Sequence, residues 1–190
     1  MCMIDRYKVT LANQAEAITD VGHFFYDEVI EQYLFVSPGL ARILGVDEDD
    51  LILSSATRHM DLARVHEQDR QYVKKVYDHF FINKDTWQVE YRIVHAGGEV
   101  RWLKEMGKAF ETNGEIVQKT VGVIQDITEK KNIEQALLQS LKALLIKTPN
   151  LLVRINAHRD AIMADLLPLI AQLESVGARD IVLVVTPEGP

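Results

Sequence analysis

The stretch TWQVEYRIVHAGGEVRWLKEMGKAFETNGEIVQKTVGVIQDI, residues 86–127, decides the fold. It contains three β-prone runs rich in branched and aromatic residues: TWQVEYRIVH, GEVRWLKEMGKAFE and EIVQKTVGVIQDI. The dipeptides Gly97-Gly98 and Asn113-Gly114 lie at the two boundaries between these runs. Both dipeptides supply the positive backbone φ angles that tight hairpin turns need. The stretch therefore predicts an antiparallel meander of three strands.

Two further strands are expected upstream, because GHFFYDEV and EQYLFVS are short β-prone runs close enough together to form a hairpin. Ser37 and Pro38 then predict an N-cap and a first-turn proline for a short helix, PGLARIL, that Gly45 closes. A longer surface helix is expected over residues 67–81, where apolar side chains recur at spacings of three and four: Val73, Val76, Tyr77 and Phe80. The predicted order is two strands, several short helices and three strands.

The pattern becomes helical again after the meander. Thr128 is a suitable N-cap, and residues 129–147 carry an apolar stripe that includes Ile133, Leu137, Leu141 and Leu144. Such a stripe is too hydrophobic to stay in water on a lone helix, so we expect it to be buried in a homodimer or against the sheet. Thr148-Pro149-Asn150 ends the helix.

The remaining residues, 150–190, predict a strand LLVRINA, a helix over about 161–175 and a strand IVLVVTP, with Gly177 stopping the helix. This βαβ-like unit is too small to be stable unless it pairs with another copy or packs on the rest of the chain. The chain is thus expected to comprise an amphipathic N-terminal helix within 1–20, a main α+β domain over 21–127, a linker helix over 128–149 and the small C-terminal module.

Four pieces of the sequence together resemble the PAS domains of bacterial signalling proteins, over about residues 21–137: LFVSPGLARILGVDEDDL, VHEQDR, WQVEYRIVHAGGEVRWLKEMGKAF and VGVIQDITEKKNIEQAL. The resemblance implies a five-stranded antiparallel sheet with flanking helices over a small interior pocket. It also implies a sensory or signal-relay module that is not an enzyme. In this family an Asp-Ile-Thr junction, here Asp126 to Thr128, leads into a signalling helix.

The junction can also be interpreted from its own residues. We expect Asp126 to accept hydrogen bonds from the hairpin and Thr128 to cap the following helix, so that a change in the sheet would alter the direction of the helix. The alternative is that the two residues only end a strand and start a helix.

The C-terminal residues 150–190 resemble, more weakly, the soluble domain of the ExbD/TolR biopolymer-transport family, in a strand, an N-A-x-R-D turn, a helix and a G-A-R-D-I strand. The membrane helix with its proton-handling carboxylate, which precedes that domain in the family, is absent here, so proton-driven transport does not carry over. A truncated STAS-like module is the other interpretation.

A small apolar ligand is the kind that the pocket of such a domain would take. The candidate lining residues are the larger apolar and aromatic side chains of the domain, for each of which ordinary core packing is the alternative: Phe25, Tyr33, Leu44, Phe80, Tyr91 and Trp102.

No cofactor or metal is expected. The only cysteine is Cys2, which lies outside the expected domain. Photosensory members of the superfamily form an adduct between flavin and a cysteine of the domain, so this chemistry is not expected here. The six histidines are dispersed without the spacing of a metal site, and none is placed as a haem ligand: His23, His59, His66, His79, His95 and His158. Haem and flavin are therefore not expected, and the protein should be colourless.

Composition narrows the partners. The chain has 21 Lys and Arg against 28 Asp and Glu, a net charge of −7, and its basic residues are scattered, which disfavours nucleic-acid binding. No apolar stretch approaches the length that spans a bilayer, so we expect a cytoplasmic protein with no membrane span. The expected partners are a second copy of the chain and a separate signalling protein. The competing hypothesis is a dimerisation adaptor with a filled PAS core that senses nothing.

Overall fold

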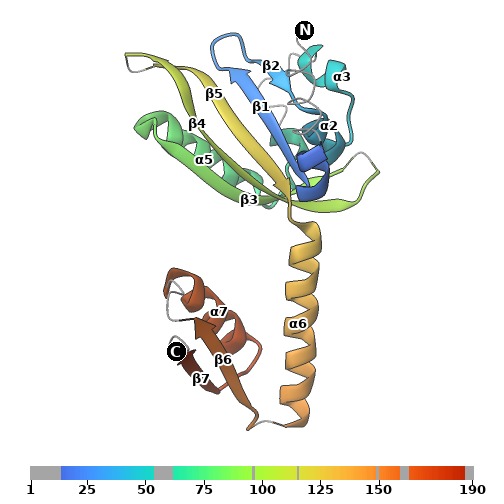
Figure 1. Cartoon of the computed structure of the whole chain (residues 1–190), viewed down its shortest axis with the longest axis vertical. Coiled ribbons are helices and arrows are strands. Elements are labelled where there is room, and N and C mark those ends of the chain that lie inside the picture. The colour runs from blue at the N-terminus through green and yellow to red at the C-terminus, as the bar shows by residue number, and fades with distance from the viewer. Residues whose placement is uncertain are drawn as a thin grey trace. The chain divides into compact units, whose positions relative to one another are not determined.

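The computed structural model describes residues 14–53, 62–95, 97–114, 116–148, 150–158 and 163–186. These fall into two compact units, Met1–Glu129 and Lys130–Pro190 (Figure 1). The division lies within the first turn of the linker helix. In the described segments, no helix is long and apolar enough to cross a membrane.

A five-stranded antiparallel sheet forms the first unit, with the strand order β2-β1-β5-β4-β3. All five predicted strands are confirmed: β1 (Val21–Asp27), β2 (Gln32–Val36), β3 (Thr86–Val94), β4 (Val100–Asn113) and β5 (Ile116–Asp126). Gly98 and Gly114 have φ of +84° and +60°, as the two hairpin turns of the meander require. The first and last strands of the unit, β1 and β5, are neighbours at the centre of the sheet.

Helices line one face of this sheet, and their ends follow from the local sequence. Helix α2 (Pro38–Leu44) begins where the Ser37 side chain accepts a hydrogen bond from the Leu40 amide. It ends at Gly45, whose φ of +68° is the left-handed conformation that favours glycine. Helix α3 (Glu48–Leu53) follows, and α5 (Arg70–Asn83) begins three residues later than the sequence suggested.

Residues 14–19 are helical, which covers the end of the expected N-terminal helix; its earlier part lies outside the described residues. Glu16 in this segment is buried, and its carboxylate accepts a hydrogen bond from the Gly39 amide at 3.0 Å and contacts His23 Nδ1 at 2.6 Å. The segment is thereby fixed to the start of α2 and to β1.

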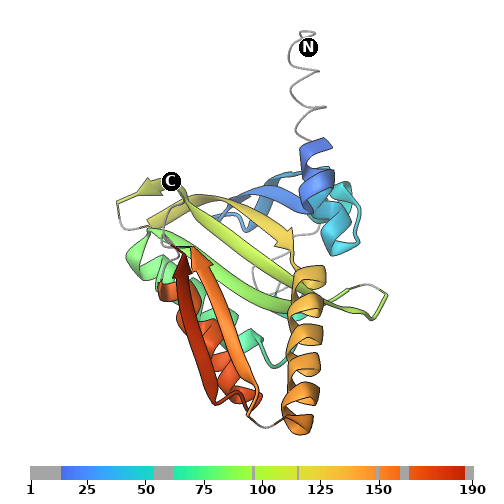
Figure 2. The ribbon, with the colours of Figure 1, turned by 60° about the horizontal axis from the view of Figure 1, so that its bottom comes forward.

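The second unit contains α6 (Thr128–Lys147, from Lys130), β6 (Leu152–His158), α7 (Met163–Ser175) and β7 (Asp180–Thr186). Strands β6 and β7 pair in parallel, so the predicted βαβ arrangement is confirmed. Figure 2 shows the two strands side by side with α7 behind them. A small core is formed by Leu145, Leu173 and Ala178. Gly177, with φ of +103°, follows α7 as expected.

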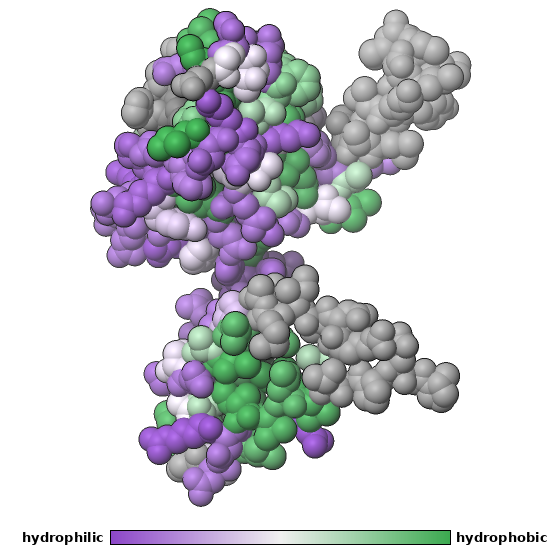
Figure 3. All heavy atoms as spheres, turned by 90° about the vertical axis from the view of Figure 1, so that its left-hand side faces the viewer, coloured by the Kyte–Doolittle hydropathy of each residue, from purple (hydrophilic) through white to green (hydrophobic). Residues whose placement is uncertain are grey.

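Apolar side chains also gather on the surface of this second unit (Figure 3). The large exposed ones on its strands and on α7 are Leu152, Leu167, Leu169, Val182 and Leu183. A two-stranded sheet and one crossover helix bury too little surface to cover these side chains.

The apolar stripe of the linker helix is divided between two faces of α6. Leu141 packs with Leu138 and Leu145 against the small βαβ unit, because these residues share one side of the helix. Ile133, Leu137 and Leu144 do not join that core, and remain 62%, 65% and 54% exposed. These three side chains are thus exposed in the single chain, and their expected burial in a homodimer stays a prediction.

Candidate functional site: an aromatic cavity and the strand-to-helix junction

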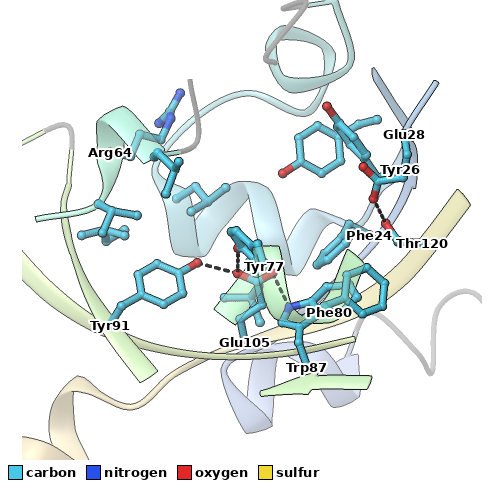
Figure 4. Close-up of a pocket in the computed structure, with 16 residues that line it drawn as sticks. Phe24, Tyr26, Glu28, Arg64, Tyr77, Phe80, Trp87, Tyr91, Glu105 and Thr120 are labelled. Atoms are coloured by element: carbon cyan, nitrogen blue, oxygen red, sulfur yellow. Dashed lines mark hydrogen bonds between the residues drawn. The ribbon is translucent and has the colours of Figure 1, made fainter. Parts of the chain in front are cut away.

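A cavity of about 60 Å³ lies between the helix-covered face of the sheet and the segment that precedes α5 (Figure 4). Strand alternation explains its lining. Side chains at every second position of β1, β3 and β4 point to this face. Among the described residues, seven aromatic rings contribute to its wall: Phe24, Tyr26, Tyr33, Tyr77, Phe80, Trp87 and Tyr91.

One carboxylate organises one end of the cavity. Glu105 on β4 is only 4% exposed and accepts hydrogen bonds from three neutral donors. The Tyr77 hydroxyl lies 3.0 and 2.9 Å from its two oxygens, Trp87 Nε1 lies 2.9 Å from Oε1, and the Tyr91 hydroxyl lies 2.7 Å from Oε2. These donors come from α5 and β3, so the carboxylate holds a helix and a strand in fixed positions around the cavity.

A second carboxylate, that of Glu28, directly follows the end of β1 (Figure 4). Thr120 on β5, 1% exposed, donates its hydroxyl proton to Glu28 Oε1 at 2.7 Å. The backbone amide of Glu28 also donates to the Gln118 carbonyl at 2.8 Å, which keeps this residue in register with β5 after β1 ends. Both Glu28 and Thr120 line the cavity.

Four of the six pocket residues suggested by the sequence line this cavity: Tyr33, Leu44, Phe80 and Tyr91. Phe25 and Trp102 lie outside it. Phe25 follows Phe24 on β1, so its ring points to the opposite face of the sheet, where it packs against Phe110 with 5.0 Å between ring centroids. Trp102 likewise alternates with the buried Leu103 and lies beneath the Arg92 guanidinium at 5.4 Å.

The lining residues that sequence reasoning missed include four aromatic ones, Phe24, Tyr26, Tyr77 and Trp87, and the polar ones Glu105, Glu28 and Thr120. A glutamate within the polar run K-E-M-G has no local mark of burial. The available signal was positional: residues 103, 105 and 107 share one face of β4, and Leu103 and Gly107 are inward-facing. The close approach at Gly107 confirms this, since a Cβ there would lie 2.2 Å from the Trp87 ring.

The junction after β5 makes the contacts that the sequence anticipated, but with the two side chains exchanged. Asp126 Oδ1 accepts a hydrogen bond from the Thr128 amide at 2.9 Å and so satisfies the first turn of α6. Thr128 Oγ1 accepts from the Trp102 amide of β4 at 2.9 Å. The Ile127 amide donates to the Trp102 carbonyl at 2.9 Å. The aspartate therefore caps the helix, and the threonine attaches it to the sheet.

The junction and the cavity share strand β4. Trp102 and Glu105 are three residues apart, about 10 Å along a strand. The pairing of β4 with β5 brings Leu103 opposite Asp126 and Glu105 opposite Ile124, which also lines the cavity. Strand β4 thus contributes both to the cavity and to the junction that holds the start of α6.

An ion pair joins the start of α5 to β3. Asp69, just before α5, makes no capping bond to its helix. Its carboxylate instead accepts hydrogen bonds from the backbone amide, Nε and Nη2 of Arg92 on β3 at 2.9, 2.9 and 2.7 Å. The side-chain hydrogen bond from Arg92 lowers the pKa of Asp69 below its ordinary value of 3.8, and the same bond raises the pKa of Arg92.

Metal binding finds no support in the described part of the chain, where no group of three or more His, Cys, Asp or Glu side chains is arranged to hold an ion. His59 lies outside the described residues. Cys2 also lies outside them, and it is the only cysteine of the sequence.

Comparison with known proteins agrees with this geometry. The model of the PAS fold matches residues 33–124. This part of the chain is a PAS domain. A crystal structure of a sensory box histidine kinase/response regulator from Burkholderia thailandensis E264 is similar at 26% sequence identity and a TM-score of 0.56, over 69% of this chain and 95% of that one.

Among curated proteins, similar stretches occur in a blue-light-activated histidine kinase of Brucella ovis, 30% identical over 126 residues, and in an uncharacterized protein, y4lL, of Sinorhizobium fredii, 35% identical over 82 residues. These matches cover 64% and 43% of this chain, but only 24% and 10% of the two relatives. The PAS domain is thus of a kind found in sensory signalling proteins. The family match ends before residues 150–190, so the ExbD/TolR resemblance of that segment gains no support from it.

Proposed function

We propose that this protein is a signal-relay module in which the PAS domain binds a small ligand in its aromatic cavity and passes a conformational change to α6. The observation that carries the proposal is the shared strand. Strand β4 contributes Glu105 to the cavity, and its Trp102 amide and carbonyl make the hydrogen bonds to Thr128 Oγ1 and the Ile127 amide that hold the junction. The chain itself performs no chemistry in this proposal.

The size of the cavity limits the ligand. About 60 Å³ corresponds to roughly five water-sized spheres of about 10–15 Å³ each. Haem and flavin are much larger than this volume. We therefore propose a ligand of only a few non-hydrogen atoms and no resident chromophore.

Native mass spectrometry of the full chain tests ligand binding. The protein should carry an added small mass when gently isolated, and Leu44→Phe, which fills the cavity from α2, should lose it. The matched control is Leu34→Phe, because Leu34 lies on β2 and is 44% exposed. If the wild-type protein and both variants each show only the mass of the unliganded chain, the sensing proposal fails.

That outcome would favour the adaptor hypothesis, in which the PAS domain only joins two copies. One observation supports such pairing in either case: Ile133, Leu137 and Leu144 form an exposed apolar stripe on α6. We propose that a second copy of the chain covers this stripe through its own α6, in a cytoplasmic homodimer that engages a separate signalling protein.

Light scattering tests the dimer. Ile133→Glu combined with Leu137→Glu should halve the measured mass. Gln139→Glu, on the opposite side of the helix and exposed, should leave it unchanged. A monomeric wild-type protein, or a dimer that survives the double substitution, would contradict the proposed interface.

A further inference from the structure

One carboxylate is buried outside the cavity, where the N-terminal helical segment meets the rest of the PAS domain. The Glu16 side chain is only 6% exposed, although Ala15 and Ala17 on either side of it are exposed. Its Oε2 accepts a hydrogen bond from the Gly39 amide at 3.0 Å, and its Oε1 lies 2.6 Å from His23 Nδ1. A Cβ at position 39 would lie 2.6 Å from Glu16 Oε2, so the glycine leaves the space that the carboxylate occupies.

His23 supplies the positive charge for this carboxylate. Among the residues that the structure describes, no other cationic side chain lies within 4.0 Å of the Glu16 oxygens. The nearby charged groups make different contacts. Arg42 on α2 donates its Nη2 to the backbone carbonyl of Glu16 at 3.2 Å and lies 4.0 Å from Asp20 Oδ1. On β5, Asp126 faces this segment with its backbone amide, which donates to the Asp20 carbonyl.

The charge of this contact depends on pH, because histidine gains or loses a proton between about pH 5 and 8. The His23 side chain is 47% exposed, so its ring exchanges protons with water while the carboxylate stays buried. A neutral ring gives the buried anion only a hydrogen bond, whereas a protonated ring forms an ion pair with it. Charge-assisted hydrogen bonds are roughly twice as strong as neutral ones. Protonation of His23 and docking of the N-terminal segment therefore favour each other.

The docked segment is also bonded to the strand that leads into α6. The Asp20 carbonyl accepts a hydrogen bond from the Asp126 amide at 2.9 Å, and the Thr19 carbonyl accepts one from the Gln125 side chain at 3.3 Å. Asp126 is the residue whose carboxylate accepts from the Thr128 amide in the first turn of α6. Movement of residues 14–20 would therefore act on the end of β5, beside the start of the helix.

We propose that Glu16 and His23 form a pH-sensitive latch. At acidic pH the protonated His23 holds residues 14–20 against α2 and β1. As the pH rises and His23 loses its proton, the segment loosens, and the hydrogen bond between Asp126 and Asp20 loosens with it. This response needs no ligand in the cavity, so it goes beyond the proposed sensing function and does not depend on it.

Amide hydrogen exchange of the full chain tests the latch. Protection factors, which correct for the direct effect of pH on exchange, are compared at about pH 5.5 and about pH 8, the two sides of histidine titration. The amides of residues 17–19 and of Asp126 should lose about three- to tenfold in protection at the higher pH. The expected change is no larger because His23 is half exposed and solvent screens the pair.

Two glutamine variants remove the proton-dependent charge while keeping the hydrogen-bonding groups. His23→Gln retains a neutral donor for Glu16, and Glu16→Gln retains an acceptor for the Gly39 amide. In each variant the difference between the two pH values should disappear at residues 17–19 and at Asp126. His79→Gln is the matched control, because it removes another histidine of the same unit from an exposed position on α5 and should respond as wild type does.

The outcomes are decisive for the latch. Wild-type protection that is equal at the two pH values overturns it. A pH response that persists in both glutamine variants also overturns it, because another group would then carry the response. If one of these variants folds poorly, the other decides. A response at residues 17–19 without one at Asp126 overturns the coupling to the start of α6. All of these results leave ligand binding in the cavity to its own test by native mass spectrometry.

Discussion

Glu105→Ala should destabilise the PAS domain severely, because it removes the single acceptor group shared by three side chains. Glu105 is 4% exposed, and the Tyr77, Trp87 and Tyr91 donors would lose their partner at once. Each buried donor left unsatisfied costs about 1–3 kcal/mol. Water entering the enlarged cavity will recover part of this loss, so we expect a decrease of about 3–5 kcal/mol in the free energy of unfolding.

Glu105→Gln is the informative comparison. The glutamine carbonyl can accept from Trp87 Nε1, which can only donate, and the glutamine amino group can donate to Tyr91, whose hydroxyl can reverse its role. We therefore expect a loss of only about 1–2 kcal/mol for this variant. Urea unfolding followed by tryptophan fluorescence is a suitable assay, because Trp87 and Trp102, the two tryptophans of the chain, both lie in the first unit.

The reasoning would be refuted if the alanine variant lost less than about 1 kcal/mol, or if glutamine proved as harmful as alanine. The first result would mean that Glu105 does not organise the cavity. The second would mean that its charge matters, and the shape and bonding of its side chain do not.

Three further predictions concern other parts of the chain. Asp69→Asn should lower the free energy of unfolding by about 1–3 kcal/mol at neutral pH. Because the folded-state pKa of Asp69 is lowered, the stabilisation by Arg92 is present above the ordinary pKa of 3.8 and is lost as the pH falls through the folded-state pKa. The stabilities of wild type and variant should therefore converge in acid unfolding curves. Gly107→Ala should lower the melting temperature, since the added Cβ would lie 2.2 Å from the Trp87 ring, whereas Gly97→Ala, with its nearest contact at 4.0 Å, should be tolerated; equal melting temperatures would contradict the close packing. A peptide of residues 150–190 should fold only at high concentration in circular dichroism, because its apolar surface needs a partner, and a folded monomer at low concentration would disprove this.

The sequence predicted the order of elements well because their signals are local. Gly98 and Gly114 have the positive φ that their turns require, and Ser37, Pro38 and Gly45 fix the ends of α2. Such signals depend on a few neighbouring residues. They do not depend on which parts of the chain meet in space.

The cavity was only partly predictable, because its lining depends on the phase of each strand. Trp102 is the larger apolar residue and looked inward-facing, yet the register of β4 with β5 turns Leu103 and Glu105 inward instead. Burial of Glu105 becomes favourable only when α5 and β3 bring three donors to it. No local pattern in the sequence predicts that these three donors lie next to Glu105.

The linker stripe shows the same limit. Helical spacing placed Ile133, Leu137, Leu141 and Leu144 on one broad apolar face. The structure narrows the buried part to the side that carries Leu141, because the small βαβ core covers only one sector of α6. Which sector it would cover depends on the chain reversal after Lys147, which periodicity does not encode.

Hydrogen exchange at the start of α6 tests the relay most directly. Filling the cavity with Leu44→Phe should change the protection of the amides at residues 128–134, and the exposed control Leu34→Phe should not. Adding Thr128→Val, which removes the acceptor for the Trp102 amide, should abolish that response to cavity filling. Unchanged protection of residues 128–134 in stably folded Leu44→Phe protein would contradict a relay from the cavity to the helix.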